Sequence, residues 1–185
     1  FYELTKMYGG DFFAPDLRAA FHSRAGSQAL TLLRDLYLTW RVTPPELPSW
    51  QFDAVSNAFD AGQVAMIADW PATYARHVSA LGDRLGVARY PRGPAGCFVY
   101  SGGFTWAIPR ATANLESALA LLLFVTSSEC QASEARQGAY VPRQSVQRQI
   151  ALESRPGSRE AERLALLDET VAKHLLIPPR LAAYP

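Results

Sequence analysis

Apolar residues recur at helical spacing over most of the chain, and this pattern predicts a series of helices. An early run begins after Ser23, a residue type that caps helices, and predicts a helix over 24–40. Its apolar positions from Ala29 to Trp40 share one face, which we expect to lie in the core. The same spacing predicts further helices: one ending near Met7, one through Phe52, Val55 and Phe59, and others over 72–81, 114–126, 128–137, 144–152 and 159–175.

Short apolar runs between these helices predict strands over 64–68, 85–90 and 101–108. Strands that alternate with helices indicate the α/β class, here with helices dominant. We expect the first two strands to lie in one mixed sheet, with the helix over 24–40 packed on one of its faces.

Two of the predicted strands carry groups suited to binding a ligand. Asp69 and Trp70 follow the first strand, while Gly102, Gly103 and Phe104 begin the third. Ends of strands that present an aromatic ring beside polar groups and glycines are where open α/β sheets place binding sites. We therefore predict a binding crevice here. The alternatives are a core position for Trp70 and a helix-capping role for Asp69.

The composition limits the classes of function. The 185 residues are 49% hydrophobic and 19% charged, with a net charge of +1, so a nucleic-acid surface is not indicated. Cys97 and Cys130 could form one bridge or remain two free thiols. The three histidines are far apart and are expected at the surface or at helix caps. No apolar run approaches the ~20 residues of a membrane span, and no motif for a metal or cofactor is present.

Five segments, in order, resemble the sugar-binding type of bacterial extracellular solute-binding proteins of ABC importers. The segment 59–67 is similar to that family's F-x-x-G-x-x-A-M motif, and 101–108 to its G-G-x-x-x-A-I strand. The helix pair over 116–131, the turn from Gly138 to Arg143 and the segment 178–184 also resemble family segments. The resemblance covers the chain from about Phe21 onward.

This resemblance implies a periplasmic-binding-protein type II-like fold that closes about a hinge on a small solute. It implies no enzyme activity and no cofactor. Carried over position by position, it places eight residues at the ligand: Asp69, Trp70, Gly102, Gly103, Phe104, Tyr140, Arg143 and Arg180. For Tyr140 and Arg143 the residues alone favour a structural role, and only the resemblance assigns them to the ligand.

Members of the family are much longer than this chain, so we expect it to represent their carboxy-terminal portion. On this basis 1–101 is assigned to the substrate-binding lobe, 102–150 to a hinge strand and helices that contact the first lobe, and 151–185 to the return into the substrate-binding lobe. The apolar helices over 114–137 are then expected to find cover by folding back or in a homodimer.

The implied partners are a sugar or oligosaccharide and the permease subunits of the transporter, with no nucleic acid. The implied location is periplasmic or extracellular, with the protein soluble or lipid-anchored. Two alternatives remain: an effector-sensing domain of a transcription regulator, and a hydrolytic enzyme using Ser101 or Asp69. A DNA-binding motif encoded upstream would distinguish the first of these.

Overall fold

The computed structural model describes residues 1–103 and 105–178, and these fold into two compact units. Unit 1 comprises Phe1–Ala68, Ala88–Gly102 and the chain from Asp168, and unit 2 comprises Asp69–Val87 and Gly103–Leu167. The chain is helix-rich, as predicted, with 53% of the described residues in helices. The expected lobes 1–101, 102–150 and 151–185 stay a prediction, because units defined by contacts within this chain are not the lobes of a two-lobed fold.

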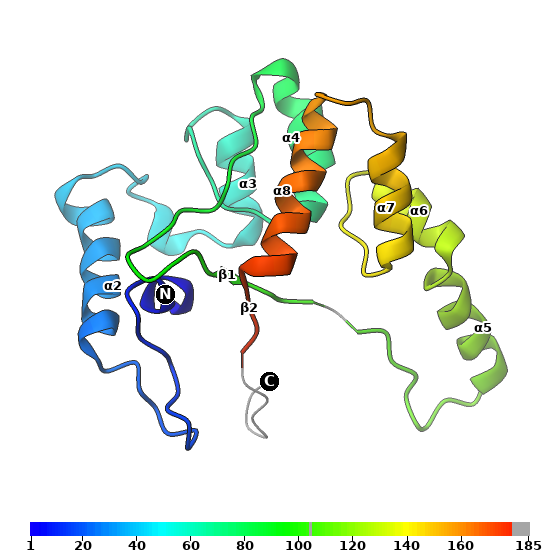
Figure 1. Ribbon diagram of the computed structural model, residues 1–185, viewed down its shortest axis with the longest axis horizontal. Coiled ribbons are helices and arrows are strands. Elements are labelled where there is room, and N and C mark those ends of the chain that lie inside the picture. Colours follow the sequence, from blue (N-terminus) through cyan, green and yellow to red (C-terminus); the bar gives the residue numbers. More distant parts are fainter. Residues whose placement is uncertain (104, 179–185) are drawn as a thin grey trace. The chain divides into compact units, whose positions relative to one another are not determined.

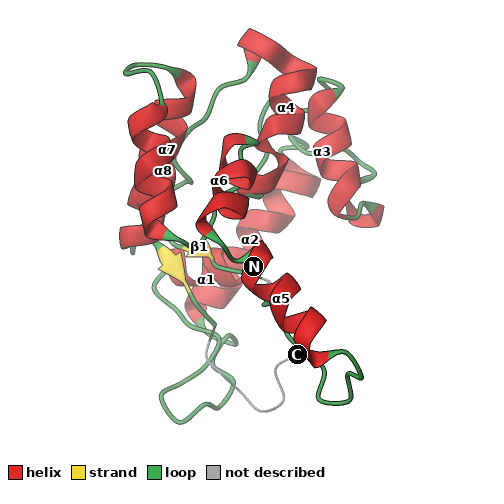
Figure 2. Ribbon diagram, turned by 90° about the vertical axis from the view of Figure 1, so that its right-hand side faces the viewer, coloured by secondary structure: helices red, strands yellow, loops and turns green. Residues whose placement is uncertain are grey.

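Unit 1 is built from short helices and one pair of strands. Its helices are α1 (Tyr2–Met7), α2 (Arg24–Arg34) with a π-helical turn at Asp35–Thr39, a 3₁₀ turn at Leu47–Ser49, and α3 (Phe52–Asp60). Strand β1 (Val99–Tyr100) pairs in parallel with β2 (Leu175–Leu176), and α1 lies beside β1 (Figure 1, Figure 2).

Close packing of α1 against α2 organises the core of unit 1. Met7 and Ala29 are 2% and 0% exposed. A Cβ atom on Gly26 would lie 1.9 Å from the Phe21 carbonyl oxygen, so only glycine fits at this approach. The Glu3 carboxylate accepts hydrogen bonds from the Tyr90 hydroxyl at 2.6 Å and the Tyr100 amide at 2.5 Å. Glu3 thereby ties α1 to two segments about 90 residues away in the sequence.

Unit 2 contains a 3₁₀ turn at Pro71–Thr73, α4 (Tyr74–Leu81), a 3₁₀ turn at Gly82–Arg84, α5 (Leu115–Val125), α6 (Ser128–Arg136), α7 (Gln144–Glu153) and most of α8 (Arg159–Lys173). Helices α6 and α7 pack side by side (Figure 1). Their inward residues join one residue of the turn between them and one of α8 in a hydrophobic core: Ala132, Ala135, Val141, Val146, Ile150 and Leu164.

The helix predictions are confirmed to within a few residues, because local signals set the helix ends. Ser23 and Ser127 each accept a hydrogen bond from an amide of the first turn, at 3.2 and 3.1 Å, as capping residues do. Gly138 follows α6 at a φ of +96°, a conformation that glycine adopts without strain.

The strand predictions are wrong. The third predicted strand is paired only at its start, where the Ser101 amide donates to the Leu176 carbonyl at 2.9 Å. Segments 64–68, 85–90 and 105–108 have no regular secondary structure, and β1 and β2 are the only strands among the described residues. A strand requires a hydrogen-bonded neighbour, and none of these segments has one within the described part of the chain. Met66 and Trp106 are 88% and 65% exposed, which shows that they lack a covering layer as well. The predicted mixed sheet, and with it the packing of 24–40 on a sheet face, is absent from this part of the chain.

The predicted core face of 24–40 is also only partly correct. Ala29 is buried, but Leu33 and Trp40 are 40% and 55% exposed. The π-helical turn at Asp35–Thr39 inserts extra backbone relative to an α-helix, so Trp40, which follows it, leaves the apolar stripe. Leu33 precedes this turn, so the turn does not explain its exposure.

We predict that Asp11 makes the stability of unit 1 depend on pH. Its carboxylate accepts hydrogen bonds from Lys6 at 2.7 Å, Tyr2 at 3.1 Å and the Phe12 amide at 2.7 Å. Burial acts to raise the pKa of Asp11, but these hydrogen bonds outweigh it and hold the pKa below its usual 3.8. The stabilisation is therefore complete above 3.8 and is lost as the pH falls through the lower folded-state pKa.

Asp11→Asn should lower the free energy of unfolding by about 0.5–1 kcal/mol at neutral pH, a modest value because the pair is partly exposed. Urea unfolding at several pH values measures this, and the difference should shrink below pH 3.8. Asp16→Asn, which breaks an exposed pair with Arg18, is the control and should change nothing. A pH-independent effect of Asp11→Asn would contradict the prediction.

Candidate functional site

Asp69 is held within the protein by the residues that follow it. Its Oδ1 accepts the Trp70 amide at 2.7 Å, and its Oδ2 lies 3.0 Å from His77 Nε2 on α4. The side chains of Asp69 and His77 are 11% and 7% exposed. The carboxylate therefore links the start of this segment to α4. The expectation of a surface or capping position for His77 is wrong, since the buried carboxylate draws the imidazole inward. A direct role for Asp69 at a ligand stays a prediction.

Trp70 lies at the start of the helical segment with its side chain 42% exposed. Its carbonyl accepts hydrogen bonds from the Thr73 hydroxyl at 2.7 Å and the Thr73 amide at 3.1 Å. Its amide is bound to Asp69. The backbone of Trp70 is thus fixed on both sides while a large part of the indole faces outward. This exposure favours the ligand-facing interpretation over a core position.

The turn from Gly138 to Arg143 lies in the same unit. The Arg143 guanidinium donates to the Thr126 carbonyl at 2.8 Å, and the Arg143 amide donates to Gln131 Oε1 at 3.2 Å. Arg143 thus joins the end of α5 to the start of α7, as the structural alternative expected. Tyr140 is half-buried. Ligand contacts by these two residues stay predictions.

The glycine pair lies where the chain passes from unit 1 to unit 2, between Gly102 and Gly103. Both glycines are exposed, and a Cβ atom on Gly103 would meet no atom within 4 Å. Open space at this point is compatible with a ligand or with a hinge. The other two predicted residues, Phe104 and Arg180, lie outside the described residues.

A buried arginine that sequence reasoning missed joins three elements of unit 2. Arg163 on α8 is 4% exposed, and its guanidinium donates to Glu160 at 3.0 and 2.6 Å and to the Gly138 carbonyl at 3.1 Å. It also lies over the Tyr74 ring of α4, 4.4 Å from the ring centre. Glu160 and Arg163 are three residues apart, a spacing that could have indicated an ion pair. Nothing in the sequence indicated that Arg163 would be buried.

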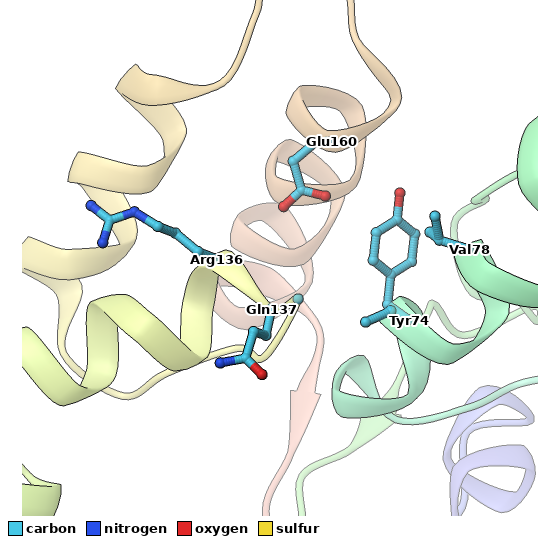
Figure 3. A pocket seen from close by; sticks show the side chains of 7 residues that line it. Tyr74, Val78, Arg136, Gln137 and Glu160 are labelled. Atoms are coloured by element: carbon cyan, nitrogen blue, oxygen red, sulfur yellow. The ribbon is translucent and has the colours of Figure 1, made fainter.

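These contacts border a cavity of about 200 Å³ in unit 2. Tyr74 and Glu160 reach toward the same hollow, whereas Arg136 turns away from it (Figure 3). Arg136 is instead paired with Glu153 on α7, at 3.1 Å. Gln137 and Gly138 complete the polar side of the lining, and Ala75 and Val78 the apolar side.

The electrostatics of the cavity suit binding. Burial and then the negative charge of Glu160 raise the pKa of Tyr74 above its usual 10.0, so its phenol stays protonated at neutral pH. The Tyr74 hydroxyl makes no hydrogen bond to any residue of 1–103 or 105–178. Both Glu160 oxygens already accept from Arg163, so the Tyr74 hydroxyl is the group of this pair that could bind a hydroxyl of a ligand.

The described residues contain no group of three or more His, Cys, Asp or Glu side chains able to hold a metal ion. Cys97 and Cys130 are both free, which decides between the two alternatives left open by the sequence. Within the described part of the chain, no helix has the length and apolar character needed to cross a bilayer.

Comparison with known families gives a match to the model of the bacterial extracellular solute-binding proteins over residues 2–157. A "probable ABC transporter-binding protein" of Deinococcus radiodurans is 27% identical over 143 residues, covering 75% of this chain and 34% of that protein.

Solved structures of the same kind resemble this one. The match to maltose-bound MalE3 of T. maritima covers 98% of this chain and 47% of the MalE3 chain. The sequence identity is 25% and the TM-score is 0.83. The match to an ABC transporter solute-binding protein of Thermotoga lettingae bound with α-D-tagatose covers 80% of this chain and 39% of that protein's chain. The sequence identity is 25% and the TM-score is 0.70. The fold is therefore of the periplasmic-binding-protein type II, as predicted, and the chain spans about half or less of the length of these relatives.

We predict that unit 2 depends strongly on Arg163. Arg163→Met keeps much of the side-chain volume but removes the charge, leaving Glu160 and the Gly138 carbonyl without their donors. Glu160 is 35% exposed and can be hydrated, so the main loss is the charged donor to the Gly138 carbonyl. This should cost about 1–3 kcal/mol, and thermal unfolding should occur at a lower temperature.

The matched control is Arg136→Met, because Arg136 forms an exposed pair with Glu153. That pair should be worth at most about 1 kcal/mol. Equal destabilisation by the two substitutions would show that Arg163 has no special role.

Proposed function

We propose, because the chain belongs to the bacterial extracellular solute-binding protein family, that it acts in the solute-binding component of an ABC importer and that the solute is a sugar. The observation that carries this proposal is the likeness to MalE3 over 98% of the chain, in a structure with bound maltose. The tagatose-bound relative supports the same class of ligand.

Trp70 is the residue of this chain best suited to contact the sugar. Sugars present apolar C–H faces that stack on flat aromatic rings, and an indole offers the largest such ring. The Trp70 indole is 42% exposed on a backbone fixed by Asp69 and Thr73. A pre-positioned ring loses little conformational freedom on binding, so more of the contact energy contributes to affinity.

The remaining predicted residues take supporting roles in this proposal. Asp69 would position Trp70 through the bond to its amide and would itself be oriented by His77. Exposed Gly102 and Gly103 would admit the ligand or bend at a hinge. Tyr140, Arg143 and the two residues outside the described part, Phe104 and Arg180, keep the roles that the family pattern assigns to them. The protein would bind its solute without changing it.

Functions of a complete solute-binding protein follow from the same membership as further proposals. The protein would close about a hinge on the sugar and deliver it to the permease subunits in the membrane. Family membership indicates a location outside the cytoplasm. This proposal has two versions: in one the protein is attached to the membrane by a lipid anchor, and in the other it is freely soluble.

Helix α5 supports a proposal about assembly. Apolar residues lie on all sides of this helix. Four of them are each about 60% exposed: Leu115, Leu121, Leu123 and Phe124. A helix that is apolar all round is normally covered. We propose that in the isolated chain a second copy covers α5, giving a homodimer through the helices over 114–137.

We predict that Trp70→Ala weakens sugar binding by the complete gene product by about 1–3 kcal/mol, the size of a lost aromatic contact and its buried area. Calorimetric titration with maltose measures the change. Phe52→Ala is the control, because Phe52 is 54% exposed on α3 and belongs to no predicted ligand segment. Unchanged affinity in Trp70→Ala would remove Trp70 from the site.

We predict that the 185-residue chain alone is a dimer in light scattering and that Leu121→Glu with Phe124→Glu makes it monomeric. Two buried carboxylates at the interface would be costly to desolvate. Leu152→Glu serves as the control, since Leu152 is 88% exposed on α7. A monomeric unmodified chain at all concentrations tested would contradict the dimer.

A further inference from the structure

Unit 1 carries a groove of about 320 Å³ that contains none of the predicted ligand residues. One wall is the polar stripe of α2, where Ser27, Gln28, Thr31 and Asp35 recur at the helical spacing that puts side chains on one face. We call this feature the α2 groove. Its volume falls at the lower end of the ~300–1,000 Å³ found for small-molecule sites.

Aromatic rings from two other segments line the α2 groove. Tyr8 comes from the residue that follows α1, and Trp40 from the residue that follows the π-helical turn. The Trp40 indole is 55% exposed. An exposed indole beside a row of small polar groups is suited to contact a ligand, and it does not belong to a hydrophobic core.

The backbone around Trp40 has an unusual conformation. The π-helical turn ends with the Trp40 amide donating to the Asp35 carbonyl at 2.6 Å, and Arg41 follows at a φ of +51°. Left-handed residues other than glycine are uncommon, and π-helical turns inside α-helices occur frequently at functional sites. In a regular α-helix Trp40 would remain on the apolar stripe, so this distortion is what brings the indole to the groove.

The polar groups of the α2 groove are available to a ligand. Within residues 1–103 and 105–178, no hydrogen bond or ion pair joins the side chains of Tyr8, Ser27, Gln28 and Thr31 to another residue. The Arg24 guanidinium is likewise unpaired in this part of the chain. Asp35 is already occupied by Arg34 at 2.7 Å and by the Thr39 hydroxyl at 3.0 Å.

This set of groups indicates the chemical class of the ligand. Hydroxyl and amide side chains both donate and accept, which matches a ligand that carries many hydroxyl groups. The flat face of Trp40 matches the apolar face of a sugar ring. A single unpaired arginine beside neutral groups and the Asp35 carboxylate is less than an anion-binding site requires, because phosphates are usually bound by several donors and cations together.

We propose that the α2 groove is a second carbohydrate site, which binds a mono- or disaccharide with one ring stacked on Trp40 and its hydroxyl groups bound to Gln28 and Thr31. This site is separate in the sequence from the segments around Trp70, and its existence does not rest on the function proposed above. It would give the chain a low-affinity contact with sugar that persists when the Trp70 site is lost.

The test is a titration of the ¹⁵N-labelled 185-residue chain, followed by NMR. The chain has four tryptophans, so the indole signals of Trp40 and Trp70 can be assigned by substitution and report the two regions separately. Glucose, maltose and sucrose are the probes, with inorganic phosphate as a parallel arm. The titrations are repeated in Trp70→Ala, which removes the other proposed contact.

We expect a saturable shift of the Trp40 indole with at least one sugar, retained in Trp70→Ala. Following the same signal, Gln28→Ala should weaken this binding about threefold to tenfold, the effect of losing a hydrogen-bonding partner. Phe52→Ala, an exposed aromatic outside the groove, should change nothing. Trp40→Ala should weaken sugar binding about tenfold, and in this variant the backbone amide signals of α2 report the binding.

The proposal is overturned if no sugar moves the Trp40 indole up to about 50 mM, a concentration well above a millimolar dissociation constant. It is also overturned if phosphate alone produces the shift, or if Trp40→Ala binds as well as the unmodified chain. Loss of the shift in Trp70→Ala would assign it to the other site. A normal α2 groove response with no effect of sugar on Trp70 would leave the groove standing, and the Trp70 contact would then be judged by the titration of the complete gene product described above.

Discussion

The buried guanidinium of Arg163 is the interaction on which unit 2 depends. It satisfies a carboxylate on its own helix, the carbonyl of Gly138 and the face of Tyr74, and these three groups come from different elements. Lysine could not replace it, because a point-like ammonium cannot form two parallel bonds to Glu160 and also lie flat on a ring. Gly138 has a φ of +96°, and a Cβ atom there would stand 3.3 Å from the Tyr74 ring, so another residue would be strained and would press on the ring.

The position of the candidate site follows from this contact. Trp70 begins the segment that leads into α4, and Tyr140 and Arg143 lie just beyond Gly138. Because Arg163 fastens Tyr74 to Gly138, segments separated by about 70 residues in the sequence become parts of one unit. The Asp69 and His77 pair adds a second fixed point, at the beginning of α4.

Local features of the sequence predicted the helices, and non-local features explain what it failed to predict. The hydroxyls of Ser23 and Ser127 act within three residues, so they can be found from the sequence alone. A strand is stable only with a paired neighbour, which is why apolar segments such as 64–68 could be mistaken for strands. Arg163 was overlooked because a Glu and Arg pair three residues apart usually lies on a solvated helix face. Trp40 was assigned to the core because no sequence signal showed the π-helical turn.

Exposed apolar surface in this protein is of two physically different kinds. The indoles of Trp70 and Trp40 stand near polar side chains on a backbone that hydrogen bonds hold in place. The exposed leucines of α5 lie on a helix whose polar residues are Glu116 and Ser117, both in its first turn. A sugar needs hydrogen bonds for its hydroxyl groups as well as an apolar face, so it cannot make use of α5. Another protein surface can, because burial of aliphatic side chains alone is favourable. The tryptophans therefore point to small hydroxyl-rich ligands, and α5 points to a protein partner.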